Sequence, residues 1–377
     1  MSVNEKTGTL ENLSHVQMAA FSDVILWQKR AKKGRKIMDN RTDWVDYGKG
    51  IGIILVVYGH LLSSAYHAGI KIPEHFFLIS DSIVYGFHMP FFFLLAGLFV
   101  EGSLQKRGIK SYILDKFSRI AYPYVIWSIL QVSVEVLFSN QTQLGATFAD
   151  LAAIFYRPWG QFWFLYALFI MHIFFAITSK FGKYSTGLIF ILSAILYFYP
   201  LNIGVAGIFG FSTYFIFFVM GIILRKTLMN TERYNPSLWF ILLLFFILIG
   251  SGYIIFEFQI KPIRLSGSSH PFYFLYLAFL GITACTSLSQ YLAQKNIAPY
   301  LQWLGVYSLQ IYLVHMLAGV GIRMVLLYVF GIQNWVFHIA MGVAFALTAP
   351  IILQKISDRF KFPYLFEFKR IYDPASG

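Results

Sequence analysis

The chain has 377 residues, of which 58% are hydrophobic and only 12% are charged, and its formal net charge is +13. A soluble domain carries about 25% charged residues, so this composition excludes an ordinary water-soluble enzyme and predicts a polytopic membrane protein. Nucleic-acid binding would need Lys and Arg gathered on one soluble face, whereas here they lie between long apolar blocks.

Residues 1–42 precede the first apolar block and include the basic run 29–36. They hold no apolar region followed by a small-residue cleavage site, so they do not form a secretory signal. We expect a cytosolic tail, partly helical around 24–27, whose basic run either meets anionic lipid headgroups or stays solvated and disordered. The sequence thus predicts a tail over 1–42, a membrane domain over 43–357 and a C-terminal cytosolic tail over 358–377.

Ten apolar blocks of about 17 to 25 residues follow, each long enough to cross a hydrocarbon core of about 30 Å. They predict an all-α bundle of about ten transmembrane helices, at 49–67, 80–100, 120–138, 160–179, 184–200, 209–225, 237–257, 272–294, 303–328 and 335–354. With the N-terminal tail in the cytosol, 25 of the 30 Lys and Arg fall on the inner side. The outer side keeps Lys71, Arg157, Lys261, Arg264 and Arg323. This split follows the positive-inside rule and places both termini in the cytosol.

The first block carries Lys49 and His60 on one helical face. They are eleven residues apart, about three turns, with a rise of roughly 16 Å. Asp46 falls on nearly the same face, just outside the span. With Lys49 at the inner interface, His60 lies near the midplane, where an ionisable residue indicates a function. A neutral imidazole there could accept a proton, or it could be a buried histidine satisfied by a neighbouring helix.

The second block runs from outside to inside and carries His88 and Pro90. His88 lies about eight residues below the outer edge, roughly 12 Å deep at 1.5 Å per residue. Histidines on two adjacent antiparallel helices thus reach a similar depth, which favours one polar site. Pro90 removes an intrahelical hydrogen bond, so a helix-kinking role for the pair is the alternative to a chemical one.

Basic residues gather between the second and third blocks, at Lys106, Arg107, Lys116 and Arg119. Lys116 and Arg119 are spaced i and i+3, so they are neighbours on one helical face at the cytosolic mouth. Two cations placed there could bind phosphates. The alternative is the usual anchoring of a cytosolic loop to lipid headgroups.

Four further polar residues could line a binding site. Ser308, Tyr312 and His315 follow i, i+4 and i+7 spacing and form a polar stripe on the ninth span. Glu135 lies near the outer end of the third span. Each could equally make an interhelical hydrogen bond. The single cysteine, Cys285, excludes a disulfide framework and a cysteine-rich metal site.

Together these residues resemble the bacterial integral-membrane acyltransferases called acyltransferase family 3, in particular the fucose 4-O-acetylase-like branch. The resemblance extends from about Asp46 to Leu353. The order and spacing of several motifs carry it, at 46–51, 59–60, 87–93, 116–124, 163–165, 217–221 and 305–315. Two positions depart from the family's pattern. Lys116 stands where Arg is commoner, and Ala96 stands where Ser often precedes Gly97.

The resemblance implies ten membrane helices and transfer of an acyl group, most often acetyl from acetyl-CoA, to a hydroxyl of a sugar or another cell-envelope molecule. It implies that His60 and Lys49 are essential. A sugar hydroxyl is a poor nucleophile, and histidine titrates near the operating pH, so His60 is the expected general base, with a covalent acetyl-histidine as the alternative. Asp46 and Lys49 would orient the thioester arm or the base, and His88 would assist at the developing oxyanion or position the acceptor.

The remaining expectations concern ligands and location. Lys116 and Arg119, with Lys106 and Arg107 nearby, are expected to bind the CoA phosphates, and Glu135, Ser308, Tyr312 and His315 the acceptor. No metal is expected, because no carboxylate pairs with the histidines at ligand-like spacing. The partners would be acetyl-CoA, a sugar or lipid-linked glycan and membrane lipids, with no nucleic acid. The expected location is the bacterial cytoplasmic membrane.

Two rival functions fit parts of the sequence. A transporter or flippase for a saccharide or an anionic substrate would also use ten helices, buried histidines and a basic inner face. A membrane assembly partner without chemistry is the third interpretation. An enzyme consumes acetyl-CoA when its acceptor is present, whereas a carrier leaves the thioester intact, so this measurement separates the two classes.

Overall fold

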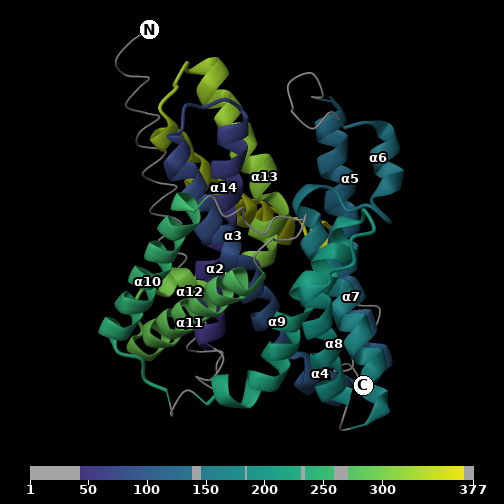
Figure 1. The fold of residues 1–377 in the computed structure, drawn as a ribbon. Helices are drawn as coiled ribbons and strands as arrows, with labels where there is room; N and C mark the ends of the chain where they lie inside the picture. The colour runs from purple at the N-terminus through teal and green to yellow at the C-terminus, as the bar shows by residue number, and fades with distance from the viewer. Residues whose placement is uncertain (1–42, 138–145, 183–184, 231–233, 259–270, 369–377) are drawn as a thin grey trace.

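The computed structural model describes residues 43–137, 146–182, 185–230, 234–258 and 271–368 (Figure 1). The expected N-terminal tail with its basic run 29–36 lies outside this part of the chain, as do residues 369–377 of the C-terminal tail and the cations Lys261 and Arg264.

The described residues form helices and turns and contain no strand. In chain order the elements are α2 (Asp43–His67), α3 (Glu74–Gly97), α4 (Val100–Lys116), η1 (Phe117–Ala121), α5 (Tyr122–Leu137), α6 (Phe148–Ala153), η2 (Gly160–Phe162), α7 (Trp163–Thr178), η3 (Ser179–Phe181), α8 (Ser185–Phe198), α9 (Ala206–Leu228), α10 (Leu238–Glu257), α11 (Pro271–Lys295), α12 (Pro299–Val306), α13 (Ser308–Met324), η4 (Val325–Val329), α14 (Trp335–Arg359) and η5 (Pro363–Leu365).

The prediction of an all-α membrane bundle is confirmed. Eight helical segments in the described chain are long and apolar enough to cross a membrane, and α8 and α10 supply two shorter apolar helices. Each of the ten predicted blocks overlaps one of these segments, but the ninth, 303–328, is divided at Tyr307 between α12 and α13. A helix suits this environment because it satisfies its own backbone hydrogen bonds where no water is present.

The segment between the second and third blocks is helical, as the i, i+3 spacing of Lys116 and Arg119 assumed. α4, η1 and α5 form one helical run, Val100–Leu137, interrupted at Gly108, whose φ of 71° lies in the left-handed region. The π turn η1 joins α4 to α5 and carries Arg119. The predicted basic residues therefore lie on a helical platform at the start of the third span.

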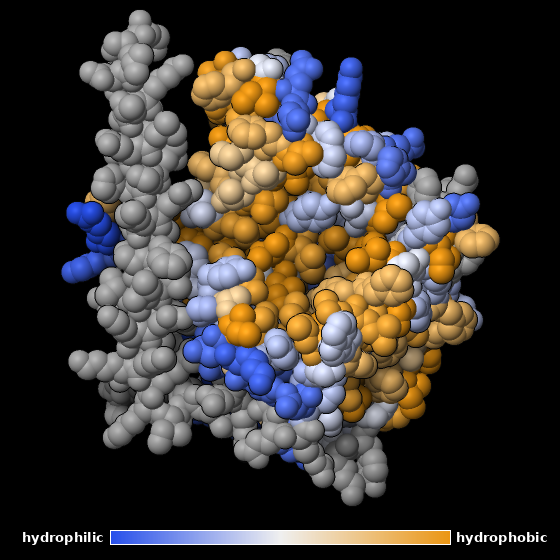
Figure 2. Space-filling view, turned by 90° about the vertical axis from the view of Figure 1, so that its left-hand side faces the viewer, coloured by the Kyte–Doolittle hydropathy of each residue, from blue (hydrophilic) through white to orange (hydrophobic). Residues whose placement is uncertain are grey.

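The outer surface is apolar, as a lipid-facing surface must be. Figure 2 shows hydrophobic residues over the middle of one face and hydrophilic residues gathered toward its upper and lower parts. On α10, Trp239 is 83% exposed and Phe246 is 75% exposed. Side chains of this kind are stable in that position only when lipid or another apolar surface covers them.

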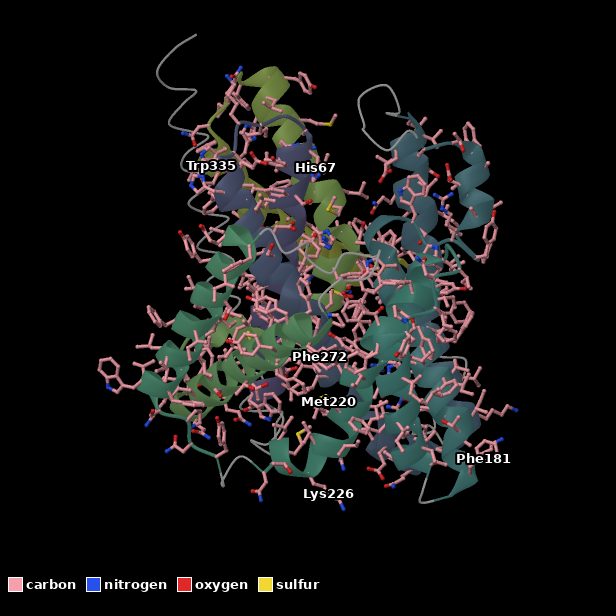
Figure 3. All side chains as sticks on the ribbon, in the orientation of Figure 1. His67, Phe181, Met220, Lys226, Phe272 and Trp335 are labelled. Carbon is pink, nitrogen blue, oxygen red and sulfur yellow. The ribbon has the colours of Figure 1, made fainter. Side chains whose placement is uncertain are left out.

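The helices alternate in direction along the chain. α2 ends at His67 and α14 begins at Trp335, and both residues lie at one end of the molecule, whereas Phe181 and Lys226 lie at the other end (Figure 3). The start of α2 and the end of α14 therefore lie on the same side of the molecule as Lys226. A chain that begins and ends its membrane domain on one side crosses the membrane an even number of times.

Glycines set the closest helix contacts. A Cβ on Gly50 of α2 would overlap the Leu301 carbonyl oxygen of α12, and one on Gly305 of α12 would overlap the Asp46 carbonyl oxygen of α2. Gly97 and Gly221 make the same kind of crossing between α3 and α9. Small residues let backbones approach this closely, and such contacts drive helix association in lipid.

A C-terminal segment, residues 363–368, docks against η1 and α5. The hydroxyls of Ser118 and Tyr122 and the indole of Trp127 donate hydrogen bonds to carbonyl oxygens of this segment, at 2.7, 2.9 and 2.6 Å. Phe366 is 3% exposed and stacks on the Trp127 ring. The segment thus forms one wall beside the basic platform.

Candidate functional site

A cavity of about 260 Å³ opens beside the basic platform and is bounded by α2, α3, the end of α4, η1, α7 and α13. Its walls are mainly apolar side chains, including Ile53, Val56 and Leu168. Its polar lining comes from Lys49, Lys116, Arg119, His172, Ser308 and Tyr312. Helices far apart in the sequence therefore converge on one chamber, and five of the residues singled out from the sequence lie in its wall.

The other candidate residues lie elsewhere. Lys106 and Arg107 are on the exposed side of α4 and do not line the cavity. His60 lies one helical turn beyond Val56, about 6 Å further along α2, and is half-buried. His88, His315 and Glu135 are also outside the cavity lining.

Asp115, which the sequence analysis missed, is the centre of the basic platform. Its carboxylate lies 2.7 Å from Arg107, 3.1 Å from Arg119 and 3.8 Å from Lys116. Glu367 of the C-terminal segment lies 3.6 Å from Arg119. The cations expected to bind phosphate therefore share two carboxylates. The i, i+4 spacing of Asp115 and Arg119 was the available signal.

A second missed pair lies behind Lys116. The Tyr112 hydroxyl and His172 Nδ1 are hydrogen-bonded at 2.6 Å, and both side chains are buried. The Lys116 ammonium lies 5.1 Å from the centroid of the Tyr112 ring, within the range of a cation–π contact. The histidine in the apolar span 160–179 was the signal that could have found this pair.

Lys49 and Asp46 form an ion pair at the cavity wall. The Lys49 Nζ lies 3.3 Å from the Asp46 carboxylate, and the side chains are 36% and 26% exposed. The i, i+3 spacing on α2 brings them together. Lys49 thus presents a cation to the cavity while a carboxylate fixes its orientation.

His60 lies in a cluster of aromatic and imidazole rings. Its Nδ1 is 3.4 Å from the Tyr85 hydroxyl, and its ring centroid is 5.3 Å from that of His315. Tyr85 in turn meets His88 edge to face at 4.9 Å. The histidines predicted at similar depth on α2 and α3 are therefore joined by Tyr85, which lies three residues before His88 and which the sequence analysis missed.

Backbone carbonyls fix the tautomers of two of these histidines. His88 Nδ1 donates to the Val84 carbonyl at 2.6 Å, and His315 Nδ1 donates to the Tyr312 carbonyl at 2.7 Å. In each neutral ring Nε2 is then the lone-pair acceptor. Both side chains are buried. Pro90 lies within the continuous helix α3, so His88 is held by its own helix.

Glu135 anchors a chain of hydrogen bonds that ends at the cavity. It accepts from Gln131 at 3.0 Å and from the Trp159 indole at 2.9 Å. Gln131 pairs with the Gln161 side chain, and the Tyr312 hydroxyl donates to the Gln161 backbone carbonyl. Glu135 is therefore connected to a cavity-lining residue through two amides.

Within the described residues, no group of three or more His, Cys, Asp or Glu side chains has the geometry to hold a metal ion. Cys285 is buried. The chemistry available to this region thus comes from imidazoles, amines, carboxylates and hydroxyls.

The model of a family described as an acyltransferase domain matches residues 42–355. Nodulation protein NolL of Mesorhizobium japonicum is 26% identical over 170 residues, which cover 44% of this chain and 44% of that protein. Nodulation protein NolL of Sinorhizobium fredii is 23% identical over 202 residues, which cover 53% of this chain and 52% of that protein. The chain spans about half the length of the curated relatives that it matches. No solved structure matches it.

Proposed function

The chain belongs to the acyltransferase family whose model it matches over 42–355, and we propose that this membrane acyltransferase moves an acetyl group from acetyl-CoA to a sugar hydroxyl. The acceptor would be an exopolysaccharide, a lipid-linked oligosaccharide or another cell-envelope glycan.

The convergence of Lys49, Lys116 and Arg119 on one apolar cavity carries this proposal. CoA consists of an anionic nucleotide joined to a long, weakly polar arm that ends in the thioester. A basic rim above an apolar chamber matches both parts, since phosphates form charge-assisted hydrogen bonds with Arg and Lys. Lys106 and Arg107, which lie outside the rim, would add long-range electrostatic attraction for the CoA phosphates.

The reaction would take place where the cavity meets the ring cluster. His60 accepts the proton of the acceptor hydroxyl, and the hydroxyl oxygen attacks the thioester carbonyl carbon. The new C–O bond forms as the C–S bond breaks, and the departing thiolate takes the proton from His60. Lys49, held by Asp46, orients the thioester arm, and His88 assists at the oxyanion or positions the acceptor.

The acceptor would approach the ring cluster from the end of the molecule where His67 and Trp335 lie. Tyr312, Ser308 and the chain anchored at Glu135 are the polar groups available for its hydroxyls, whereas His315 is buried behind them. With the basic end in the cytosol, donor and acceptor would meet in the bacterial cytoplasmic membrane from opposite sides.

Release of free CoA thiol by the purified protein tests this function. Acetyl-CoA would be supplied with and without polysaccharide extracted from cells that lack the protein, and labelled acetyl would be followed into that polysaccharide. We expect thiol release and label transfer only when both substrates are present. A protein that binds or moves the saccharide while the thioester stays intact is a transporter, and this result would exclude the enzyme function.

A further inference from the structure

His315 has a buried nitrogen that no described residue satisfies. The side chain is 0% exposed, its Nδ1 proton is committed to the Tyr312 carbonyl, and Nε2 has no hydrogen-bond partner among the described residues. A buried acceptor without a donor is unfavourable. Because the ring is fully enclosed and lies outside the cavity lining, a neighbouring side chain is better placed to supply the donor than a substrate in the cavity.

His60 is the neighbour that can supply this donor. The two ring centroids are 5.3 Å apart, and the ring planes are inclined by 49°. Two imidazoles joined by an N–H···N hydrogen bond of about 2.9 Å have centroids roughly 5 Å apart. The observed spacing therefore needs little more than a reorientation of one ring to form that bond.

Close packing of α13 on α2 maintains this spacing. A Cβ on Gly319, one turn after His315, would overlap the side chain of Leu61, the residue next to His60. The missing side chain at Gly319 leaves room for the Leu61 side chain to pack against α13 at the level of the histidines. The two rings are thus held by this packing and by the bond from Nδ1 to the Tyr312 carbonyl.

We propose that His315 is a positioning residue for His60, an inference that rests on the proposed function. Once His60 has taken the proton of the acceptor hydroxyl, its ring carries two N–H groups, and one of them donates to Nε2 of His315. His315 keeps its own proton on Nδ1 throughout, and the transferred proton leaves His60 for the CoA thiolate as the C–S bond breaks.

Neutral His60 already carries one N–H group, and this group becomes a stronger donor when the ring is charged. A hydrogen bond from it to Nε2 of His315 therefore stabilises the transition state more than the bound substrates, so it raises kcat and leaves the affinity for acetyl-CoA unchanged.

Two substitutions at position 315 separate this role from its alternatives. His315→Gln places an amide oxygen near the former Nε2 and keeps an acceptor for His60. His315→Asn keeps a donor near Nδ1 for the Tyr312 carbonyl but leaves no acceptor at the far end. We expect kcat within about threefold of the parent for the glutamine variant and about 10- to 100-fold lower for the asparagine variant, with unchanged KM for acetyl-CoA in both.

A pair of glycine variants tests the same contact without altering either histidine. Gly319→Ala places a methyl group against the Leu61 side chain, so Leu61 or the neighbouring helices must shift beside His60, whereas Gly321→Ala, on the same helix, has open space for its Cβ. We expect Gly319→Ala to lower kcat at least tenfold and Gly321→Ala to match the parent. Elution from a sizing column and the melting temperature in detergent identify any variant that has lost its fold.

The outcomes are distinct. A parental kcat in the asparagine variant, or a glutamine variant as inactive as the asparagine one, would overturn the role of Nε2 as an acceptor for His60. An equal effect of the two glycine variants would also overturn it. Acetyl transfer by the parent protein is measured first. If the parent transfers no acetyl group, the proposed function itself fails, and this failure is distinct from any difference between the variants.

Discussion

Removing Lys116 and Arg119 together should weaken binding of acetyl-CoA in a salt-dependent manner. The side chains are 19% and 46% exposed and both line the cavity. A partly exposed cation contributes about 1 kcal/mol to a phosphate contact, so the two would contribute about 2 kcal/mol, or roughly 30-fold in Kd. Asp115 keeps its ion pair with Arg107 in the double alanine variant, so its carboxylate does not become an unpaired charge.

Titration of purified protein with CoA at several ionic strengths measures this effect. We expect a 30-fold higher Kd for the double variant at low salt, shrinking to several-fold near 1 M, where the screening length is about 3 Å. Lys110→Ala combined with Lys226→Ala is the matched control, because it removes two exposed cations, one from α4 and one from α9, that do not line the cavity. Equal losses in the two double variants would mean that general attraction, and not contact at the rim, governs binding. An unchanged Kd in the cavity variant would refute the donor site.

Three further outcomes follow from the same site. His60→Gln should abolish transfer while CoA binding persists, because glutamine cannot take a proton at neutral pH, and a glutamine variant with substantial turnover would remove His60 from the base role. Lys49→Arg should retain most activity and Lys49→Ala should lose it, measured as labelled acetyl transferred; an inactive arginine variant with an intact fold would show that the site needs a compact ammonium. Glu367→Gln should tighten CoA binding a few-fold at low salt, since it frees Arg119 from a carboxylate 3.6 Å away, and weaker binding would show that Glu367 holds Arg119 in place.

The spans could be predicted from the sequence because lipid imposes length and polarity directly on each helix. All ten apolar blocks correspond to helices or parts of helical runs. The i, i+3 pairing of Asp46 and Lys49 and the shared face of Ser308 and Tyr312 also follow from local spacing, which the sequence contains in full.

Contacts between distant helices could not be predicted in this way. Tyr85 joins two histidines because α2 packs on α3, and His172 meets Tyr112 because α4 packs on α7. In the sequence, Tyr85 and His172 look like any aromatic or polar residue that fills a helix interface. The ion pairs of Asp115 could not be predicted for another reason. The net positive charge of this segment suggested that its cations are available to phosphates, whereas the helical form of α4 and η1 places the Asp115 carboxylate beside three of them.

The glycine crossing of α2 and α12 bears on how such a protein can move. Carriers of this size alternate their openings by rocking one group of helices against another around a central site. Backbones that touch at Gly50 and Gly305 leave no side-chain layer on which α2 could slide past α12. We therefore expect α2, which carries Lys49 and His60, to keep its position relative to α12 during the reaction. The two substrates would then diffuse to α2, one from each side of the membrane.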